Sequence, residues 1–149
     1  VRNILWLGDG IVGDDTDGHV DDLTRFVDAQ TVVTAVEPDP QDPNHPPLQV
    51  NLQRLQAMCT QDGDSLRVIE LPMPEPVLDQ GERLPASYAN FYIGNRTVLM
   101  PAFGQSRDAD AQAILEQCFP SRRVLPLDSI DLIWGLGSFH CLTQQEPRG

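Results

Sequence analysis

The sequence has no long hydrophobic run, and none of its apolar stretches approaches the ~18 residues of a membrane-spanning helix. It also shows no signal peptide. Basic residues are few, with 10 Lys and Arg against 22 Asp and Glu and a net charge of −12. Nucleic-acid binding needs a basic surface, so the charge argues against such a partner, while it is compatible with a cationic ligand. We therefore expect neither a membrane nor a nucleic acid as partner.

Cysteine is scarce as well, at three residues without the spacing of a disulfide framework. An odd count of unpaired thiols favours a reducing compartment, so we expect a cytoplasmic protein. The sequence opens without Met and goes straight into a strand-like segment, residues 3–7. That opening is typical of a piece from the middle of a larger protein, so a signal peptide further upstream stays open.

Metal-ligand patterns are missing too. The three cysteines and three histidines show no zinc-ligand spacing. The acidic cluster at residues 14–22 resembles a calcium loop only superficially. Aligning Gly18 with the invariant loop glycine puts Gly13 and Thr24 at the first and last ligand positions, where acidic residues are required. We predict no metal site and no cofactor.

What the sequence does contain is one domain's length, 149 residues, with a repeating order of elements. Two β-branched strands, an amphipathic helix and a returning strand are predicted at 24–27, 31–36, 48–59 and 66–71. The same order returns at 90–93, 97–100, 110–119 and 123–126. A proline-rich loop over residues 72–85 separates the two, and residues 130–134 lead into what reads as the opening of a third unit.

This order predicts an α/β fold of about two ββαβ modules, residues 19–71 and 86–127, with a closing segment at 130–149. Each module is too small to bury its own apolar faces, so neighbours must pack around a shared axis. Equivalent loops then face one central cleft. The loops at His19, at residues 87–90 and at Cys141 should therefore converge.

Two segments 122 positions apart carry the candidate chemistry, Gly18-His19-Val20-Asp21-Asp22 and Phe139-His140-Cys141. A thiol, an imidazole and a carboxylate are the groups needed for covalent attack on a cationic, nitrogen-rich carbon. Since alternate residues of an extended segment point to opposite sides, we expect His140 to point away from Cys141 and to be structural. His45 is expected to be a solvated loop residue. Core packing is expected for the remaining cysteines and both tryptophans, Cys59, Cys118, Trp6 and Trp134.

Three ordered stretches, residues 13–22, 84–93 and 140–145, resemble the signatures of the agmatine deiminases and bacterial peptidylarginine deiminases. These enzymes belong to the pentein, or guanidino-group-modifying, superfamily. The resemblance covers the whole chain. It implies a five-module α/β propeller, of which residues 1–149 would be the C-terminal two-fifths of a single catalytic domain.

The resemblance also implies site roles. Cys141 would attack the guanidinium carbon, and His19 would protonate the leaving amine and then activate water. Asp21 would hold guanidinium nitrogens. Three further residues are candidates for substrate binding. Asp15 lies in the acidic loop, Asn90 faces the cleft by repeat equivalence, and Gly137 precedes the nucleophile in a stretch less glycine-rich than the family's.

The resemblance favours agmatine as substrate, with N-carbamoylputrescine and ammonia as products. Peptidyl-arginine or free arginine would use the same residues, and the sequence does not separate the three. A non-catalytic binding or assembly module is the alternative from another class, because further guanidinium-binding carboxylates of the family lie upstream of Val1. Open blades would expose strand edges, which predicts homo-oligomers. A cysteine–histidine peptidase is disfavoured, since Asp21 lies too near His19 in sequence to orient its ring.

Overall fold

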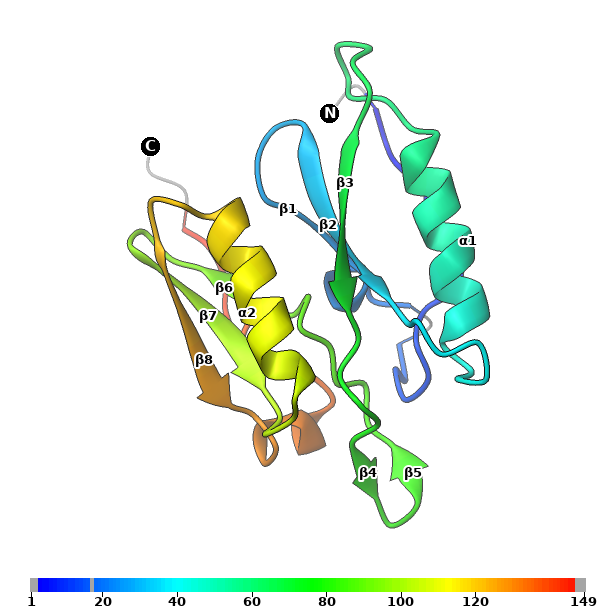
Figure 1. Ribbon diagram of the computed structural model, residues 1–149, viewed down its shortest axis with the longest axis vertical. Coiled ribbons are helices and arrows are strands. Elements are labelled where there is room, and N and C mark those ends of the chain that lie inside the picture. The colour runs from blue at the N-terminus through cyan, green and yellow to red at the C-terminus, as the bar shows by residue number, and fades with distance from the viewer. Residues whose placement is uncertain (1–2, 17, 147–149) are drawn as a thin grey trace.

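The computed structural model describes residues 3–16 and 18–146, and it shows a mixed α/β fold with two three-stranded sheets side by side (Figure 1). The first sheet contains β1 (Thr24–Phe26), β2 (Thr31–Val36) and β3 (Arg67–Pro72), in that order. The second contains β6 (Tyr92–Ile93), β7 (Thr97–Ala102) and β8 (Arg123–Asp128). The predicted order of strands is confirmed in both.

The two sheets share one topology. In each, the first two strands pair antiparallel through a short turn, and the third strand pairs parallel with the central one. A parallel pair needs a crossover, and helices α1 (His45–Gln56) and α2 (Arg107–Cys118) supply it. The central strand β2 is a run of Thr, Val and Ala with five of its six residues buried, as its β-branched composition favours.

The first helix begins earlier and ends earlier than the sequence pattern predicted. Pro46 and Pro47 stand in its first turn, where the fixed φ and missing N–H of proline are tolerated. His45 is thus the first helical residue, and its Nδ1 lies 2.6 Å from the carbonyl oxygen of Glu37, so the prediction of a solvated loop histidine was wrong. Because α1 ends at Gln56, Cys59 falls beyond it and is exposed, which contradicts its predicted core role.

Other local predictions also need correction. Residues 3–7 form no strand, and only their leucines pack on the core, as partly buried neighbours. Trp6 and Trp134 are 74% and 57% exposed, so neither is a core residue. Cys118 is partly buried and packs against the main core, as predicted. The loop at 72–85 contains a small hairpin of β4 (Leu78–Asp79) and β5 (Glu82–Arg83), and residues 130–134 lead into the 3-10 helix η2 (Leu132–Gly135).

One apolar cluster joins the two sheets. Val33 and Leu71 from the first sheet are buried in it together with Val98 and Met100 from the second. Leu115 of α2 belongs to the same cluster, and α2 packs on both β3 and β8, between the two sheets (Figure 1). The two sheets therefore share one main apolar core.

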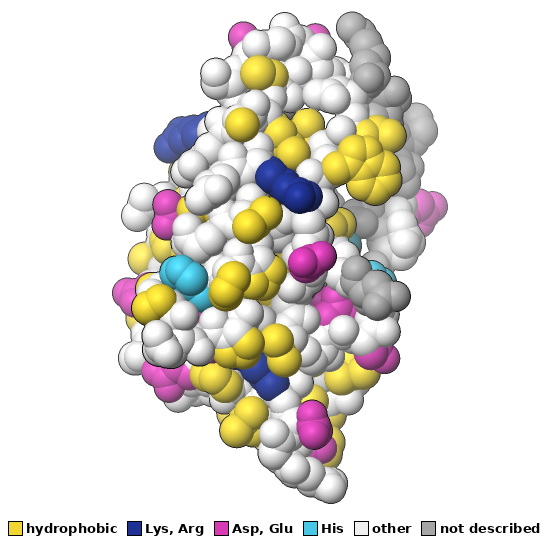
Figure 2. Space-filling view, turned by 90° about the vertical axis from the view of Figure 1, so that its right-hand side faces the viewer, with side chains coloured by type: hydrophobic (Ala, Val, Ile, Leu, Met, Phe, Trp, Pro, Cys, Tyr) yellow, Lys and Arg dark blue, Asp and Glu magenta, His cyan; other side chains and the backbone are white. Residues whose placement is uncertain are grey.

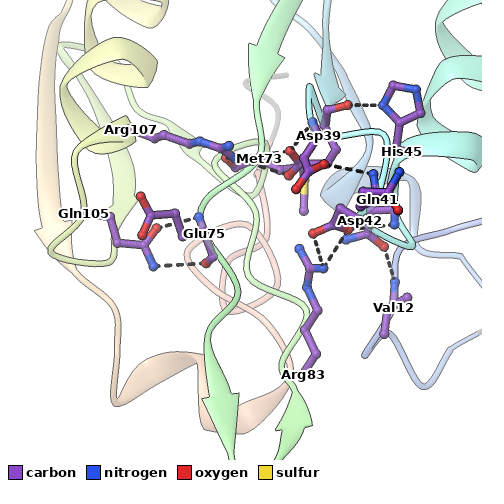
Figure 3. A network of polar contacts seen from close by, with 12 residues as sticks. Val12, Asp39, Gln41, Asp42, His45, Met73, Glu75, Arg83, Gln105 and Arg107 are labelled. Atoms are coloured by element: carbon purple, nitrogen blue, oxygen red, sulfur yellow. Dashed lines mark hydrogen bonds and ion pairs between the residues drawn. The ribbon is translucent and has the colours of Figure 1, made fainter.

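Polar contacts fix the loops that follow β2 and β3 (Figure 3). Arg107 of α2 reaches the buried carboxylate of Glu37 at 3.2 Å and donates to the carbonyl oxygen of Met73 at 2.9 Å. Arg83 pairs with both carboxylate oxygens of Asp42, at 2.8 and 2.7 Å. Charge-assisted bonds of this kind hold the loops at one end of the sheets against α2 and the β4–β5 hairpin.

The side of the molecule over α1 carries hydrophobic side chains interspersed with isolated charges (Figure 2). Val50, on the outward side of this helix, is 46% exposed. Within residues 3–16 and 18–146, neither helix has the length and hydrophobicity needed to cross a membrane.

Candidate active site

The loop before β1 is built around Asp14. Its carboxylate accepts backbone N–H bonds from Thr16 at 2.9 Å, Gly18 at 3.1 Å and His19 at 2.7 Å. Burial would raise the pKa of Asp14, but these bonds, with one from the Thr16 hydroxyl, hold it below its usual value. These bonds hold His19 at the start of the short 3-10 helix η1 (Val20–Asp22).

Asn90 is the hub at which this helix meets the second half of the chain. Its amide nitrogen lies 3.0 Å from Asp21 Oδ2, 2.9 Å from Asp22 Oδ1 and 3.0 Å from Cys141 Sγ. Its amide oxygen accepts the backbone N–H groups of Ser138, His140 and Cys141, at 3.1, 3.1 and 3.3 Å. The side chain is 1% exposed. One buried amide thus joins three segments that are far apart in sequence.

Arg25 of β1 fixes the backbone on both sides of this hub. Its Nη1 donates to the carbonyl oxygens of Ala89, at 3.2 Å, and Phe91, at 2.9 Å. Its guanidinium lies 4.8 Å from the centre of the Phe91 ring, within the range of a cation–π contact. Asn90 is therefore held in place from the first sheet as well as by its own loop.

Cys141 lies in a turn, and this overturns the expectation for its neighbour. The N–H of Leu142 donates to the Ser138 carbonyl oxygen at 3.2 Å, so residues 138–142 curl rather than extend. Adjacent side chains in such a turn need not alternate. His140 Nδ1 lies 2.8 Å from Asp21 Oδ2, and Cys141 Sγ lies 3.2 Å from the same oxygen. His140 therefore meets the same carboxylate as the thiol, and its predicted opposite orientation was wrong.

Gly137 leaves the space that Cys141 fills. A Cβ at this position would lie 2.7 Å from the Cβ and 2.8 Å from the Sγ of Cys141, closer than real contacts allow. Beside it, the hydroxyl of Ser138 is buried and has no hydrogen-bond partner among the described residues. The turn of residues 138–142 is thus closely packed on its glycine side.

The ionisable groups of the site shift one another's pKa values. Burial, followed by the neighbouring Asp21 charge, raises the pKa of Asp22 to about 7. Burial would raise the pKa of Asp21 too, but hydrogen bonds from His140 and Cys141 hold it below its usual value. Although the Cys141 side chain is reachable from solvent, partial burial and then the bond to Asp21 raise the pKa of its thiol, against a lowering by the Asn90 amide. A cation placed beside Asp21 would favour the thiolate.

A cavity of about 410 Å³ opens next to this cluster. Asp21, His140 and Arg25 are its charged and titratable lining residues, and the rest of its wall is mainly apolar, from Leu5, Leu7, Val20, Phe26, Val32 and Leu55. Among the described residues, no group of three or more His, Cys, Asp or Glu side chains is arranged to hold a metal ion.

The structure brings together four of the six predicted site residues, Cys141, Asp21, Asn90 and Gly137. The His19 side chain is exposed, and its ring makes no hydrogen bond to the rest of the described chain. Asp15 is also exposed, without a side-chain hydrogen bond within the described segments.

Sequence reasoning missed three further residues of this cluster, His140, Asp22 and Arg25. Asp22 follows Asp21 directly in a three-residue helical turn, so the doubled aspartate itself was an available signal. His140 reaches the site because residues 138–142 form a turn, and Arg25 reaches it through its contacts with Ala89 and Phe91. The spacing of residues in the sequence predicts neither arrangement.

The family profile described as Porphyromonas-type peptidyl-arginine deiminase matches residues 1–147. The chain belongs to this family. Among relatives with curated names, it is 38% identical over 165 residues to an agmatine deiminase of Pseudomonas fluorescens, covering 99% of this chain and 45% of that protein. It is 34% identical over 165 residues to an agmatine deiminase of Pseudomonas aeruginosa, covering 99% and 45%.

Solved structures of the family agree. The agmatine deiminase of Enterococcus faecalis superposes with a TM-score of 0.90 at 31% identity, covering 97% of this chain and 44% of that one. An agmatine deiminase of C. jejuni with substrate bound gives a TM-score of 0.83 at 31% identity, covering 91% and 39%. The chain thus spans less than half the length of the relatives it matches.

Proposed function

We propose that this chain carries the nucleophile half of a guanidinium-hydrolysing deiminase, with agmatine as the favoured substrate. The observation that carries the proposal is the 3.2 Å contact between Cys141 Sγ and Asp21 Oδ2, with the Asn90 amide on both. A carboxylate pairs well with planar N–H groups, so it would hold a guanidinium with its carbon beside the sulfur. The named relatives are agmatine deiminases.

The reaction follows from these positions. The guanidinium charge beside Asp21 lowers the pKa of the thiol, and the thiolate attacks the guanidinium carbon to give a tetrahedral adduct. Protonation of one nitrogen releases ammonia and leaves an amidino-thioether on Cys141. Water then adds to the same carbon, and the C–S bond breaks to give the ureido product and the free thiol.

His19 is the proposed proton carrier. It would give its proton to the departing nitrogen and then take one from the attacking water. Its place beside η1, in the loop ordered by Asp14, puts it on the same short segment as Asp21. Its ring lacks a hydrogen bond to other described residues, which leaves both nitrogens available to substrate and water.

The ring architecture is part of the proposal. The two sheets repeat one ββαβ topology, and the relatives are more than twice as long. A five-bladed arrangement of such modules would place the Asp21 and Cys141 loops around a central axis, with further carboxylates supplied by the other modules. Asp15, Asn90 and Gly137 would then border the bound guanidinium.

The test is a colorimetric assay for ureido products, run on the 149-residue chain and on any longer protein that carries it. Substrates are agmatine, an arginine-containing peptide and free arginine. Cys141→Ala is the test variant, and Cys59→Ala is the matched control because Cys59 is an exposed cysteine outside the site. Circular dichroism verifies that each variant folds.

We expect ureido product from agmatine with the unmodified protein and with Cys59→Ala, and none with Cys141→Ala. Preference for the arginine peptide would move the proposal to the peptidyl-arginine branch named by the family. Activity retained by Cys141→Ala would overturn the nucleophile assignment. Absence of product from every substrate in the longer protein would favour a non-catalytic module.

A further inference from the structure

One carboxylate oxygen of the site receives three donors. Asp21 Oδ2 lies 2.8 Å from His140 Nδ1, 3.0 Å from Asn90 Nδ2 and 3.2 Å from Cys141 Sγ. The other oxygen, Oδ1, makes no side-chain hydrogen bond to the described residues. The two oxygens of Asp21 thus have different environments, since all the side-chain donors among the described residues meet Oδ2.

The proton on His140 can be assigned from its partner. Asp21 has a pKa below its usual value and is therefore an ionised carboxylate near neutral pH, which only accepts hydrogen bonds. Nδ1 of His140 must then carry the hydrogen of the 2.8 Å bond. The backbone of His140 is itself fixed, because its N–H bonds to both oxygens of Asn90, each at 3.1 Å.

We propose that His140 is a positioning residue that acts through Asp21. Its Nδ1–H fixes Oδ2 beside the Cys141 thiol and offsets part of the carboxylate charge there, so that Oδ1 is left for the guanidinium. The inference deepens the proposed function, since it assigns a role around the nucleophile of the same site. His140 is distinct from His19, the proposed proton carrier. It contacts the carboxylate of Asp21 and lies 119 positions after it in the sequence.

The charged groups around His140 support this division of roles. Asp21 contacts it from η1, Arg25 lines the same cavity from β1, and Cys141 is its neighbour in the turn, while Asp22 binds the Asn90 amide. Arg25 is occupied by the carbonyl oxygens of Ala89 and Phe91. Among these groups, the donors to Asp21 Oδ2 are therefore His140, Cys141 and Asn90.

The test measures the thiol rather than the reaction. The rate of Cys141 alkylation by iodoacetamide is followed from pH 6 to 10, with the labelled peptide quantified by mass spectrometry. The variants are His140→Phe, which removes the donor, and His140→Asn, whose amide nitrogen replaces Nδ1. His45→Asn is the matched control, because its Nδ1 also bonds within the chain but to the carbonyl oxygen of Glu37.

We expect His140→Phe to slow alkylation at pH 7 about three- to tenfold, because a carboxylate without this donor raises the pKa of the adjacent thiol and leaves less of it as thiolate. His140→Asn should restore most of the rate, and His45→Asn should match the unmodified chain. An unchanged rate in His140→Phe would overturn the proposal. A faster rate would do the same, since it would show that the ring only covers the thiol.

A double-variant cycle separates action through Asp21 from a general effect on packing. In an Asp21→Asn background, His140→Phe should have no further effect on the alkylation rate. An equal slowing in both backgrounds would contradict the inference. Because alkylation needs no substrate, these outcomes stand apart from the ureido assay, and a failed deiminase proposal would leave them interpretable.

Discussion

Gly137 offers a direct test of how tightly the turn around Cys141 is packed. We expect Gly137→Ala to displace the Cys141 side chain, because the added Cβ would lie 2.7 Å from its Cβ. If Cys141 is the nucleophile as proposed, the expected result is a loss of at least about tenfold in ureido formation, since a displaced thiol is poorly aligned for attack. Gly135→Ala is the control, with nothing within 4 Å of its Cβ, and it should retain activity. Equal activity of the two variants would contradict the packing argument.

Asp22 should make stability depend on pH. Its carboxyl has a folded pKa of about 7 against the ordinary value of 3.8, so between these values the native state binds more protons than the unfolded state. Stability then falls as pH rises through this range. Asp22→Asn removes the penalty, and we expect it to gain about 2 kcal/mol relative to the unmodified chain between pH 5 and pH 8.

Urea denaturation at the two pH values measures this gain. Asp62→Asn is the control, because Asp62 is exposed and the same change there should leave the pH dependence unaltered. A constant difference between Asp22→Asn and the unmodified chain at both pH values would show that Asp22 does not titrate in this range, and would contradict the expectation.

At the scale of single residues, the sequence predicted that the loops of Asp21, Asn90 and Cys141 converge, because equivalent loops of repeated modules should face one cleft. It did not predict His140 or the three-way use of Asp21 Oδ2. Those depend on the curl of residues 138–142 and on hydrogen bonds across 119 positions, which a pattern of residue types does not encode.

Among the elements, the start of α2 depends on one carboxylate. Asp108 accepts N–H bonds from Phe103 and Gln105 at 3.1 Å, and the hydroxyl of the fully buried Tyr88 at 2.6 Å. We expect Asp108→Ala to destabilise the protein by about 2–3 kcal/mol, since it leaves a buried hydroxyl and two N–H groups unsatisfied. Asp110→Ala, in the same turn but exposed, should cost less than about 0.5 kcal/mol in urea denaturation. A similar loss of stability in both variants would show that the hydrogen bonds of Asp108 do not matter, and that only the negative charge in the first turn of α2 does.

Element existence was predictable, while element ends were not. The β-branched composition located the central strands, and the 3–4 spacing located both helices. The start of α1 was placed three residues late, because Pro46 and Pro47 read as loop signals although both are acceptable in a first helical turn. The exposure of Cys59 follows from the earlier helix end.

For the molecule as a whole, the shared core predicts a single unfolding transition. Leu71 lies in β3 but is fully buried against residues of the second sheet. Leu71→Ala should therefore lower the stability of both halves together by about 2–5 kcal/mol. Hydrogen exchange resolved by peptide measures this, with Leu127→Ala, 41% exposed in β8, as the control. Loss of protection confined to the first sheet would show that the halves unfold separately.

The repeat predicted that neighbouring modules pack on each other, and α2 between β3 and β8 is that contact. The tryptophans show why burial was harder to predict. Trp6 and Trp134 are large and apolar, yet Trp6 lies in a segment without regular structure and Trp134 in the short 3-10 helix η2, and both side chains are mainly exposed. Residue type sets a preference for burial, and the path of the chain decides whether it is met.

The site described above also changes the acidity of its own sulfur. In the folded chain, partial burial and Asp21 raise the pKa of the Cys141 thiol, so the resting side chain is largely protonated and a poor target for oxidants. Before folding, Asp21 is 120 positions away and the thiol returns to ordinary acidity. Folding should therefore lower the reactivity of this sulfur toward oxidants at neutral pH, relative to the unfolded chain.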